Sequence, residues 1–147
     1  MAKRYRKSFR NKVLEYISAM PGCVVLRSDV AILGDSRQVS RALRALIEDE
    51  ELIRLGYGLY AKAEPSPRPE LINRPIIRAK AGFTEACIEI LKRLNVQWEL
   101  SQAIKDYNEG RSQQVPARFE IRLKSRFRRT IFSGNRNLRY ERMIYAK

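Results

Sequence analysis

The chain contains no histidine, and its two cysteines, Cys23 and Cys87, lie far apart in the sequence. Structural zinc sites need clustered thiolate and imidazole ligands, so the sequence excludes zinc fingers and zinc ribbons. The lack of histidine also excludes the Ser-His and Cys-His pairs that activate many enzyme nucleophiles. Because 44% of the residues are hydrophobic, a core can form without a disulfide. We therefore expect a cytosolic protein with two small, buried thiols.

Long hydrophobic runs are also lacking, and none approaches the roughly 20 residues that a membrane-spanning helix requires. The basic N-terminus is followed by no apolar run, so we expect neither a secretory signal nor a membrane partner. There is no glycine-rich phosphate loop either, because Gly56-Tyr57-Gly58 lies between two short apolar stretches and predicts a hairpin turn. The sequence therefore predicts no cofactor and no metal ion.

Acidic residues are scarce at the two ends of the chain, which has a net charge of +14. Residues 1–12 carry six Lys or Arg and no acid, and residues 111–147 carry eleven Lys or Arg against two acids. Residues 13–110 hold thirteen bases and fourteen acids and are nearly neutral. This charge favours a polyanionic partner, with nucleic acid ahead of an anionic membrane. We expect a cytoplasmic, nucleoid-associated protein.

The first half of the chain predicts the element order of a winged helix-turn-helix. The predicted elements are a helix over 9–20, a strand over 23–26, helices over 29–33 and 36–50, and a hairpin with strands over 52–55 and 59–62. Ser8 and Ser28 are the expected N-caps of the first two helices. Asp35 and Gln38 are placed for a capping box on the third. Glycine at the turn permits the tight hairpin.

The second half predicts a small basic region after a proline-rich stretch. The predicted elements are helices over 83–94 and 101–107, a strand over 119–124, and strands over 127–132 and 137–145 around a turn at 133–135. The fold class is therefore α+β, a winged helix-turn-helix followed by a small α+β region with an antiparallel sheet. The predicted divisions are a basic arm over 1–12, the winged helix over 13–63, an irregular linker over 64–82 and a C-terminal domain over 83–147.

The helix predicted over 36–50 has an apolar stripe and, on the opposite side, a stripe of arginines. In a helix-turn-helix the second helix enters the major groove, where Arg reads guanine, Gln reads adenine, and Ser or further Arg residues bind phosphate. The DNA contacts predicted from this helix are Ser36, Arg37, Gln38, Ser40, Arg41 and Arg44. The alternatives are an ordinary solvated helix face and a winged helix that binds protein instead.

Three other sets of residues extend the predicted contacts. The hairpin offers Arg54 and, at its tip, Tyr57. The N-terminal arm offers Lys3, Arg4, Arg6 and Lys7, which either lie along DNA or form a solubilising tail. A second basic surface, interleaved with aromatic residues, comprises Arg122, Lys124, Arg126, Arg128, Arg129 and Arg139. It is either the solvent side of a sheet or a second site for DNA, an RNA-associated partner or an acidic protein.

One spacing of acidic residues is relevant to enzyme activity. Asp106 followed by Glu120-Ile121-Arg122 loosely resembles the acid and Glu-x-Lys spacing of metal-dependent nucleases. Arginine stands where lysine is needed, and Asp106 is predicted on a helix rather than a strand. Such spacings arise by chance in charged chains, so a nuclease is a remote alternative and we expect no enzyme.

A resemblance adds to this interpretation. The motifs that carry it are Ser28-Asp29-Val30, Asp35-Ser36, Val39, Ala42-Leu43, Leu46 and Gly58-Leu59-Tyr60. With the strand before them, they resemble the N-terminal winged helix of AbiEi-type antitoxins from bacterial type IV toxin–antitoxin systems. The resemblance implies a transcriptional autorepressor whose winged helix binds double-stranded operator DNA and whose C-terminal domain neutralises a cognate nucleotidyltransferase-type toxin. The alternative is an antitoxin that acts mainly through its protein partner, and the sequence leaves a homodimer open.

Overall fold

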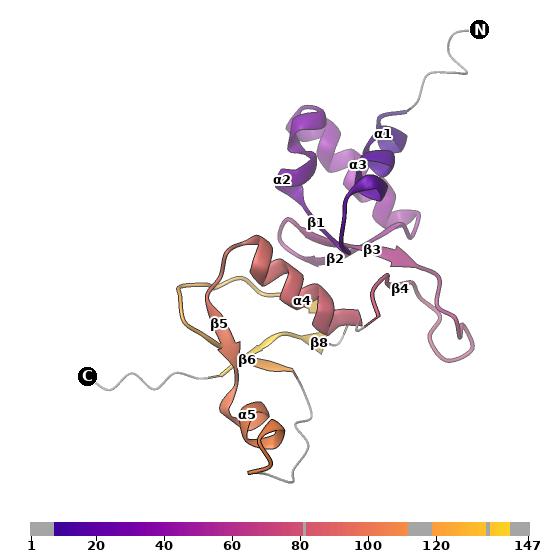
Figure 1. The fold of residues 1–147 in the computed structure, drawn as a ribbon. Helices are drawn as coiled ribbons and strands as arrows, with labels where there is room; N and C mark the ends of the chain where they lie inside the picture. The colour runs from indigo at the N-terminus through magenta and orange to yellow at the C-terminus, as the bar shows by residue number, and fades with distance from the viewer. Residues whose placement is uncertain (1–7, 81, 112–118, 135, 142–147) are drawn as a thin grey trace, which may run out of the picture.

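The computed structural model describes residues 8–80, 82–111, 119–134 and 136–141. They form a mixed α+β fold, as predicted, with five α-helices and short, mainly antiparallel sheets (Figure 1). The helices are α1 (Phe9–Ala19), α2 (Arg27–Val30) with the 3-10 turn η2 (Ala31–Leu33), α3 (Ser36–Glu48), α4 (Gly82–Arg93) and α5 (Gln102–Asn108). The strands are β1 (Val24–Leu26), β2 (Leu52–Gly56), β3 (Leu59–Glu64), β4 (Ile76–Ile77), β5 (Trp98–Leu100), β6 (Glu120–Leu123), β7 (Phe132–Ser133), β8 (Arg136–Asn137) and β9 (Arg139–Tyr140). Among these residues no helix is long and apolar enough to cross a membrane.

The largest sheet has β3 at its centre. β1 and β2 pair with it antiparallel, which gives the strand order β1-β3-β2 and confirms the predicted hairpin. The short strand β4 pairs with the far end of β3, where Ile77 is opposite Ala63 and is buried. Irregular chain was expected throughout 64–82, and this expectation was wrong at 76–77. Two β-branched isoleucines there extend the sheet instead.

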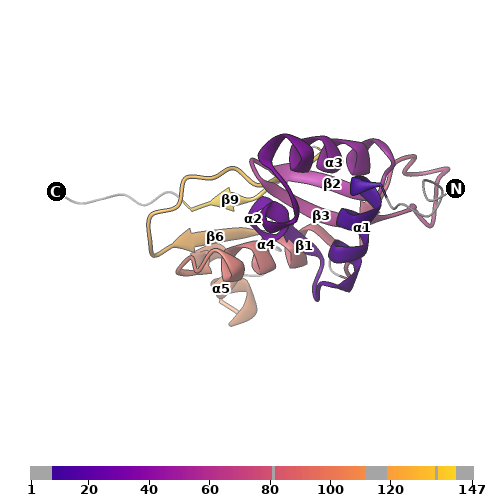
Figure 2. The same ribbon diagram turned by 90° about the horizontal axis from the view of Figure 1, so that it is seen from above.

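Side chains of this sheet alternate between two hydrophobic clusters, as the pleat of a strand requires. Val24 of β1 and Leu59 of β3 face one cluster, whereas Val25 and Tyr60 face the other. The N-terminal helices cover one face of the sheet and α4 covers the other, an arrangement that both views show (Figures 1 and 2). Because both faces are covered, β1 is a continuous apolar run rather than an alternating one.

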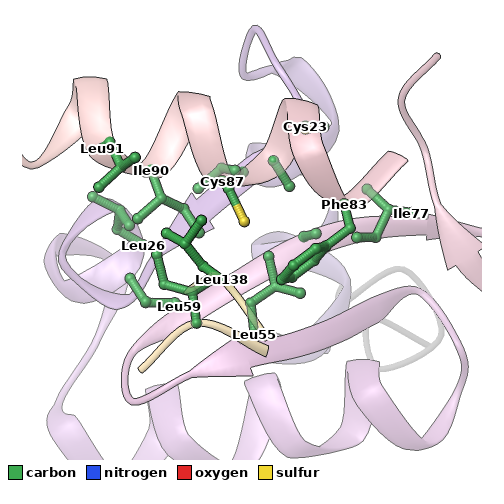
Figure 3. Close-up of a cluster of buried hydrophobic side chains, with 14 of the residues drawn as sticks. Cys23, Leu26, Leu55, Leu59, Ile77, Phe83, Cys87, Ile90, Leu91 and Leu138 are labelled. Carbon is green, nitrogen blue, oxygen red and sulfur yellow. The ribbon is translucent and has the colours of Figure 1, made fainter. Parts of the chain in front are cut away.

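Helix α4 packs the C-terminal region onto the sheet. Phe83, Cys87 and Ile90 of α4 lie over Leu55 and Leu59 of the hairpin (Figure 3). The same cluster takes in three buried residues from farther along the chain, namely Ile121, Ile131 and Leu138. Segments 13–63 and 83–141 therefore share one hydrophobic cluster. Both cysteines are free and buried, as expected.

Polar contacts also tie α4 to the start of β1. The Glu89 carboxylate accepts hydrogen bonds from the backbone N–H groups of Cys23, at 2.9 Å, and Val24, at 2.8 Å. At the end of α4, Arg93 forms an ion pair with Asp29 of α2. Gly22 has a φ of +79°, and a Cβ added there would lie 2.6 Å from Glu89 Oε2. Glycine is therefore required where the chain passes under this carboxylate.

The predicted cap of the first helix is confirmed, and that of the second was wrong. Ser8 Oγ accepts a hydrogen bond of 3.2 Å from the Asn11 N–H. Helix α2 begins one residue before Ser28, and the cap is supplied by Asp29, whose Oδ2 accepts from the Leu26 N–H at 2.8 Å. The carboxylate reaches back to the last residue of β1, so the helix starts directly from the strand.

The C-terminal sheet departs from prediction in two ways. β5, which was not predicted, pairs antiparallel with β6, but β9 pairs with β6 in parallel. The strands expected over 127–132 and 137–145 are reduced to β7, β8 and β9, and residues 142–145 lie outside the described residues. Buried Ile131 and Leu138 anchor the chain singly, joined by a 2.9 Å hydrogen bond from the Leu138 N–H to the Ile131 carbonyl. These two buried residues hold this part of the chain in place without a long series of hydrogen bonds between strands.

Candidate nucleic-acid interface

Helix α3 presents an apolar and a basic face, as predicted. Its buried residues are Val39, Ala42, Leu43 and Leu46, and its exposed arginines are Arg37, Arg41 and Arg44. The apolar face packs on α1 and the sheet. The arginine face is consequently directed away from the core and is exposed.

The capping box at the start of α3 is confirmed. Asp35 Oδ1 accepts from the Gln38 N–H at 2.8 Å, and Gln38 Oε1 accepts from the Asp35 N–H at 3.2 Å. Bidentate recognition of adenine needs both the oxygen and the nitrogen of the amide group. Because the cap occupies the Gln38 oxygen, the structure does not present Gln38 as a bidentate reader. Ser36, Arg37 and Ser40 line a shallow hollow beside it.

Arg27 holds the start of α3 against the tip of the hairpin. Its backbone N–H donates to the Gly58 carbonyl at 2.9 Å, and its guanidinium donates to the Ser36 carbonyl at 2.9 Å and to Ser36 Oγ at 3.1 Å. Arg27 therefore links the start of α3 to the hairpin tip. The sequence had related these two elements only through the element order of a winged helix. Arg27 was missed because a single arginine after a strand carries no pattern.

At the hairpin tip the Tyr57 side chain is exposed, whereas the backbone is hydrogen-bonded to two arginines. Tyr57 is 82% exposed, although tyrosine usually buries its ring at least in part. Its carbonyl accepts a 2.6 Å hydrogen bond from the Arg129 guanidinium. Arg54 is exposed, and its Nε donates to the Gly56 carbonyl at 3.2 Å. A Cβ added to Gly58 would lie 3.6 Å from both Arg129 Nη2 and Arg27 Cβ, so the two arginines flank the tip.

The six residues of the predicted second basic surface do not form one set. Arg122 forms ion pairs with Glu141 at 3.0 Å and with Glu99 at 3.4 Å, and the Glu141 carboxylate raises its pKa. This arginine is committed to the C-terminal sheet, because its charge is already balanced. Four others are exposed on the surface: Lys124, Arg126, Arg128 and Arg139. The sixth, Arg129, is half-buried beside the hairpin.

Charge along α3 is polarised. The arginines are followed by an acidic corner at 48–51, where Asp49 forms a 2.7 Å ion pair with Arg10 of α1. A polyanion is therefore attracted to the N-terminal half of α3 and repelled from its C-terminal end. The predicted arm residues Lys3, Arg4, Arg6 and Lys7 lie outside the described residues.

The spacing that loosely resembled a nuclease does not gather carboxylates in the described part of the chain. Asp106 Oδ1 accepts hydrogen bonds from Gln102 at 2.8 Å and from Arg111 at 3.1 Å, and the Gln102 contact is the main cause of its lowered pKa. Within residues 8–80, 82–111, 119–134 and 136–141, no group of three or more acids or cysteines is placed to hold a metal ion.

In comparisons with known proteins, no family model, no curated protein and no solved structure matches this chain. Its function is therefore inferred from the geometry and charge of its surface. The exposed polar and basic side chains that suit a nucleic-acid partner lie on a surface that runs from the start of α3, through Arg27, to the hairpin tip. We call this the α3–hairpin surface, and its exposed polar residues are Ser36, Arg37, Arg41, Arg44, Arg54 and Tyr57.

Proposed function

We propose that this protein is a sequence-specific regulator that binds double-stranded DNA with a winged helix. In this proposal α3 enters the major groove and the β2–β3 hairpin lies beside it on the backbone or in the minor groove. The observation that carries the proposal is the double contact of Arg27, which joins the Gly58 carbonyl to the Ser36 carbonyl. This contact joins the start of α3, the helix that carries the exposed arginines, to the hairpin tip, which carries exposed Tyr57.

The roles of the residues follow from their positions. Arg37 and Arg41 lie in the first half of α3, where side chains of a docked recognition helix reach base edges. Arg44, one turn farther along, is placed for phosphate. The guanidinium of Arg54 and the phenol of Tyr57 suit the sugar–phosphate backbone, which receives half or more of protein–DNA hydrogen bonds. Each bidentate contact to a base is worth about 1–3 kcal/mol of discrimination.

Autorepression is a further part of the proposal, supported by the resemblance to AbiEi-type antitoxins. The implied target is an operator next to the protein's own gene, and the implied second partner is a cognate toxin. Reporter expression from the native promoter, with and without the protein, tests the first. Co-purification with the product of an adjacent gene tests the second.

The central test is selection of a preferred duplex from a randomised DNA library with the full-length protein. We expect one sequence to be enriched, because α3 offers arginines to base edges. Arg41→Ala with Arg44→Ala should weaken binding to that duplex by about 2–4 kcal/mol and relax its preference.

A matched control is Arg68→Ala with Lys80→Ala, which removes two exposed cations from the segment between β3 and α4. This pair should lower affinity only slightly and leave the preference intact. Absence of any enriched sequence would overturn the proposed function. An equal effect of the two double variants would remove α3 as the reader.

A further inference from the structure

We propose that residues 124–130 belong to the same DNA-binding surface, as a phosphate-binding segment beside the hairpin, with Arg126 and Arg128 as its contacts. This inference rests on the proposed function and deepens it, since it assigns DNA backbone as the ligand of a C-terminal segment. We call residues 124–130 the basic segment.

The first observation is the position of the basic segment. The Arg129 guanidinium donates to the Tyr57 carbonyl, at 2.6 Å. One residue later, the Thr130 carbonyl approaches the other end of the turn so closely that a Cβ added to Gly56 would lie 2.5 Å from its oxygen. The segment therefore runs against the backbone of the hairpin turn. Through these contacts it adjoins Tyr57, which belongs to the α3–hairpin surface.

The second observation is that the basic segment is fixed in place. Ile131 is fully buried in the hydrophobic cluster under α4. The Tyr140 hydroxyl donates to the Arg129 carbonyl at 2.8 Å, and the Phe127 ring meets the Tyr140 ring edge-on at 6.2 Å. Residues 127, 129 and 131 thus face the protein, and the alternate residues Arg126, Arg128 and Thr130 are exposed. The two arginines are presented by an ordered chain, which lowers the entropy cost of binding.

The third observation is charge. No acid occurs between Glu120 and Glu141, so the arginines of the basic segment have no acidic neighbour in the sequence. Arginine binds phosphate with two parallel hydrogen bonds and keeps its charge at any physiological pH. Residues 13–110, which include α3 and the hairpin, are nearly neutral overall. The basic segment supplies the attraction that this region lacks, whereas Arg122 is neutralised by Glu141 and is excluded from the surface.

The test uses the full-length protein, the selected duplex and a scrambled duplex of equal length. Arg126→Gln with Arg128→Gln should reduce the slope of log affinity against log salt by about 2 on both duplexes, because each lost phosphate contact removes about 0.9. The preference for the selected duplex should remain. The control, Arg68→Gln with Lys80→Gln, removes the same charge and should leave the slope unchanged. Arg126→Lys with Arg128→Lys keeps the charge and should restore most of the slope.

Ethylation interference then locates the contacts. Some phosphates should reduce binding of the wild type when ethylated but not binding of the Gln variant. These phosphates should adjoin the ones at which Arg54→Gln abolishes the interference. The inference is overturned if the wild type prefers the selected duplex but the Gln variant has the slope of the control, or if the lost phosphates lie at the far end of the site. Either result would leave the proposed function standing. A wild type with no sequence preference would instead remove the proposed function itself.

Discussion

The guanidinium of Arg129 donates a 2.6 Å hydrogen bond to the backbone carbonyl of Tyr57, 72 residues earlier in the chain. Tyr57 is the exposed tip of the β2–β3 hairpin, and Arg129 follows the last exposed arginine of the basic segment. The contact makes the conformation of the hairpin depend on the C-terminal part of the chain. The backbone of the tip is therefore held by two arginines, Arg27 and Arg129.

Loss of this contact should loosen the tip. We expect Arg129→Ala to lower the free energy of unfolding by about 1 kcal/mol, the usual value of one hydrogen bond. Amide exchange should quicken at Arg27, whose N–H donates to the Gly58 carbonyl at the same tip. Hydrogen exchange measured by NMR checks this. Arg139→Ala, which removes an exposed arginine from β9, should leave exchange at Arg27 as it is, and an equal effect of the two variants would contradict the assignment.

Glu89 should be a major stabilising residue. Its carboxylate satisfies the backbone N–H groups of Cys23 and Val24, and a buried donor left unpaired costs about 1–3 kcal/mol. We therefore expect Glu89→Leu to lower the free energy of unfolding by about 3 kcal/mol, and Glu89→Gln by less, since one acceptor oxygen remains. Urea denaturation measures both.

The same change in an exposed position provides the control for Glu89. Glu70→Leu lies in the loop between β3 and β4 and should alter stability by no more than about 0.5 kcal/mol. If Glu89→Leu were as mild as Glu70→Leu, the two hydrogen bonds to β1 would not contribute to stability.

Local elements were predictable because their signals are local. The 3.6-residue spacing of apolar residues gave α3 and α4, and Asp35 three residues before Gln38 gave the capping box that the structure contains. Gly56-Tyr57-Gly58 gave the hairpin. Each of these depends on residues within one or two turns of chain.

Contacts between distant residues could not be predicted in the same way. Nothing near Arg27 marks it as the link between α3 and the hairpin, and nothing near Glu89 marks it as the partner of β1, 65 residues earlier. The two-sided burial of the β1-β3-β2 sheet was hidden for the same reason, since the helix that covers its second face follows a proline-rich stretch. The division of basic residues into paired Arg122 and exposed Arg126 and Arg128 also needed their three-dimensional neighbours.

Gly56 should tolerate no side chain. A Cβ at this position would lie 2.5 Å from the Thr130 carbonyl oxygen, which belongs to backbone and cannot rotate away. We expect Gly56→Ala to cost about 1–3 kcal/mol of stability through overpacking and to push the basic segment off the hairpin. Under the proposals above, this variant should also lose DNA affinity.

Gly82→Ala is the control for this effect. Gly82 has a φ of +57° and no atom within 4 Å of an added Cβ, so alanine strains the backbone without a clash. It should lower stability modestly and leave the salt dependence of DNA binding unchanged. Equal DNA affinities for the two variants, measured at a temperature where both are folded, would contradict the coupling of the hairpin to the basic segment.

The two thiols should be unreactive in the folded protein. Burial raises the pKa of Cys87 to about 12, and burial with the nearby Glu89 carboxylate raises that of Cys23 to about 12. Thiolate is the reactive form, so a thiol reagent at neutral pH should label both residues only after unfolding. Labelling of native protein as fast as in denaturant would contradict this burial.

The same shifts predict a pH dependence of stability. An unfolded thiol ionises near its ordinary pKa of 9.0, whereas the folded thiols stay protonated up to about 12. Their contribution is complete below pH 9 and falls as the pH rises toward 12, by at most about 1.4 kcal/mol per pH unit for each thiol. Cys87→Ala should therefore lose less stability over this interval than the wild type. Urea titrations on the two sides of pH 9 check the sign, and parallel losses would contradict it.

A fragment ending after β3 should not fold as the full chain does. Residues 8–64 include α1–α3 and the complete hairpin, but they leave Leu26, Leu55 and Leu59 without the helix that covers them. Re-exposing three leucines costs about 6 kcal/mol, which is comparable with the whole stability of a small domain. We expect the fragment to give a poorly dispersed NMR spectrum and to bind hydrophobic dyes, whereas a chain of residues 8–141 gives sharp, dispersed signals. Cooperative unfolding of the fragment would instead establish 13–63 as an autonomous domain. The sheet would then fold without α4.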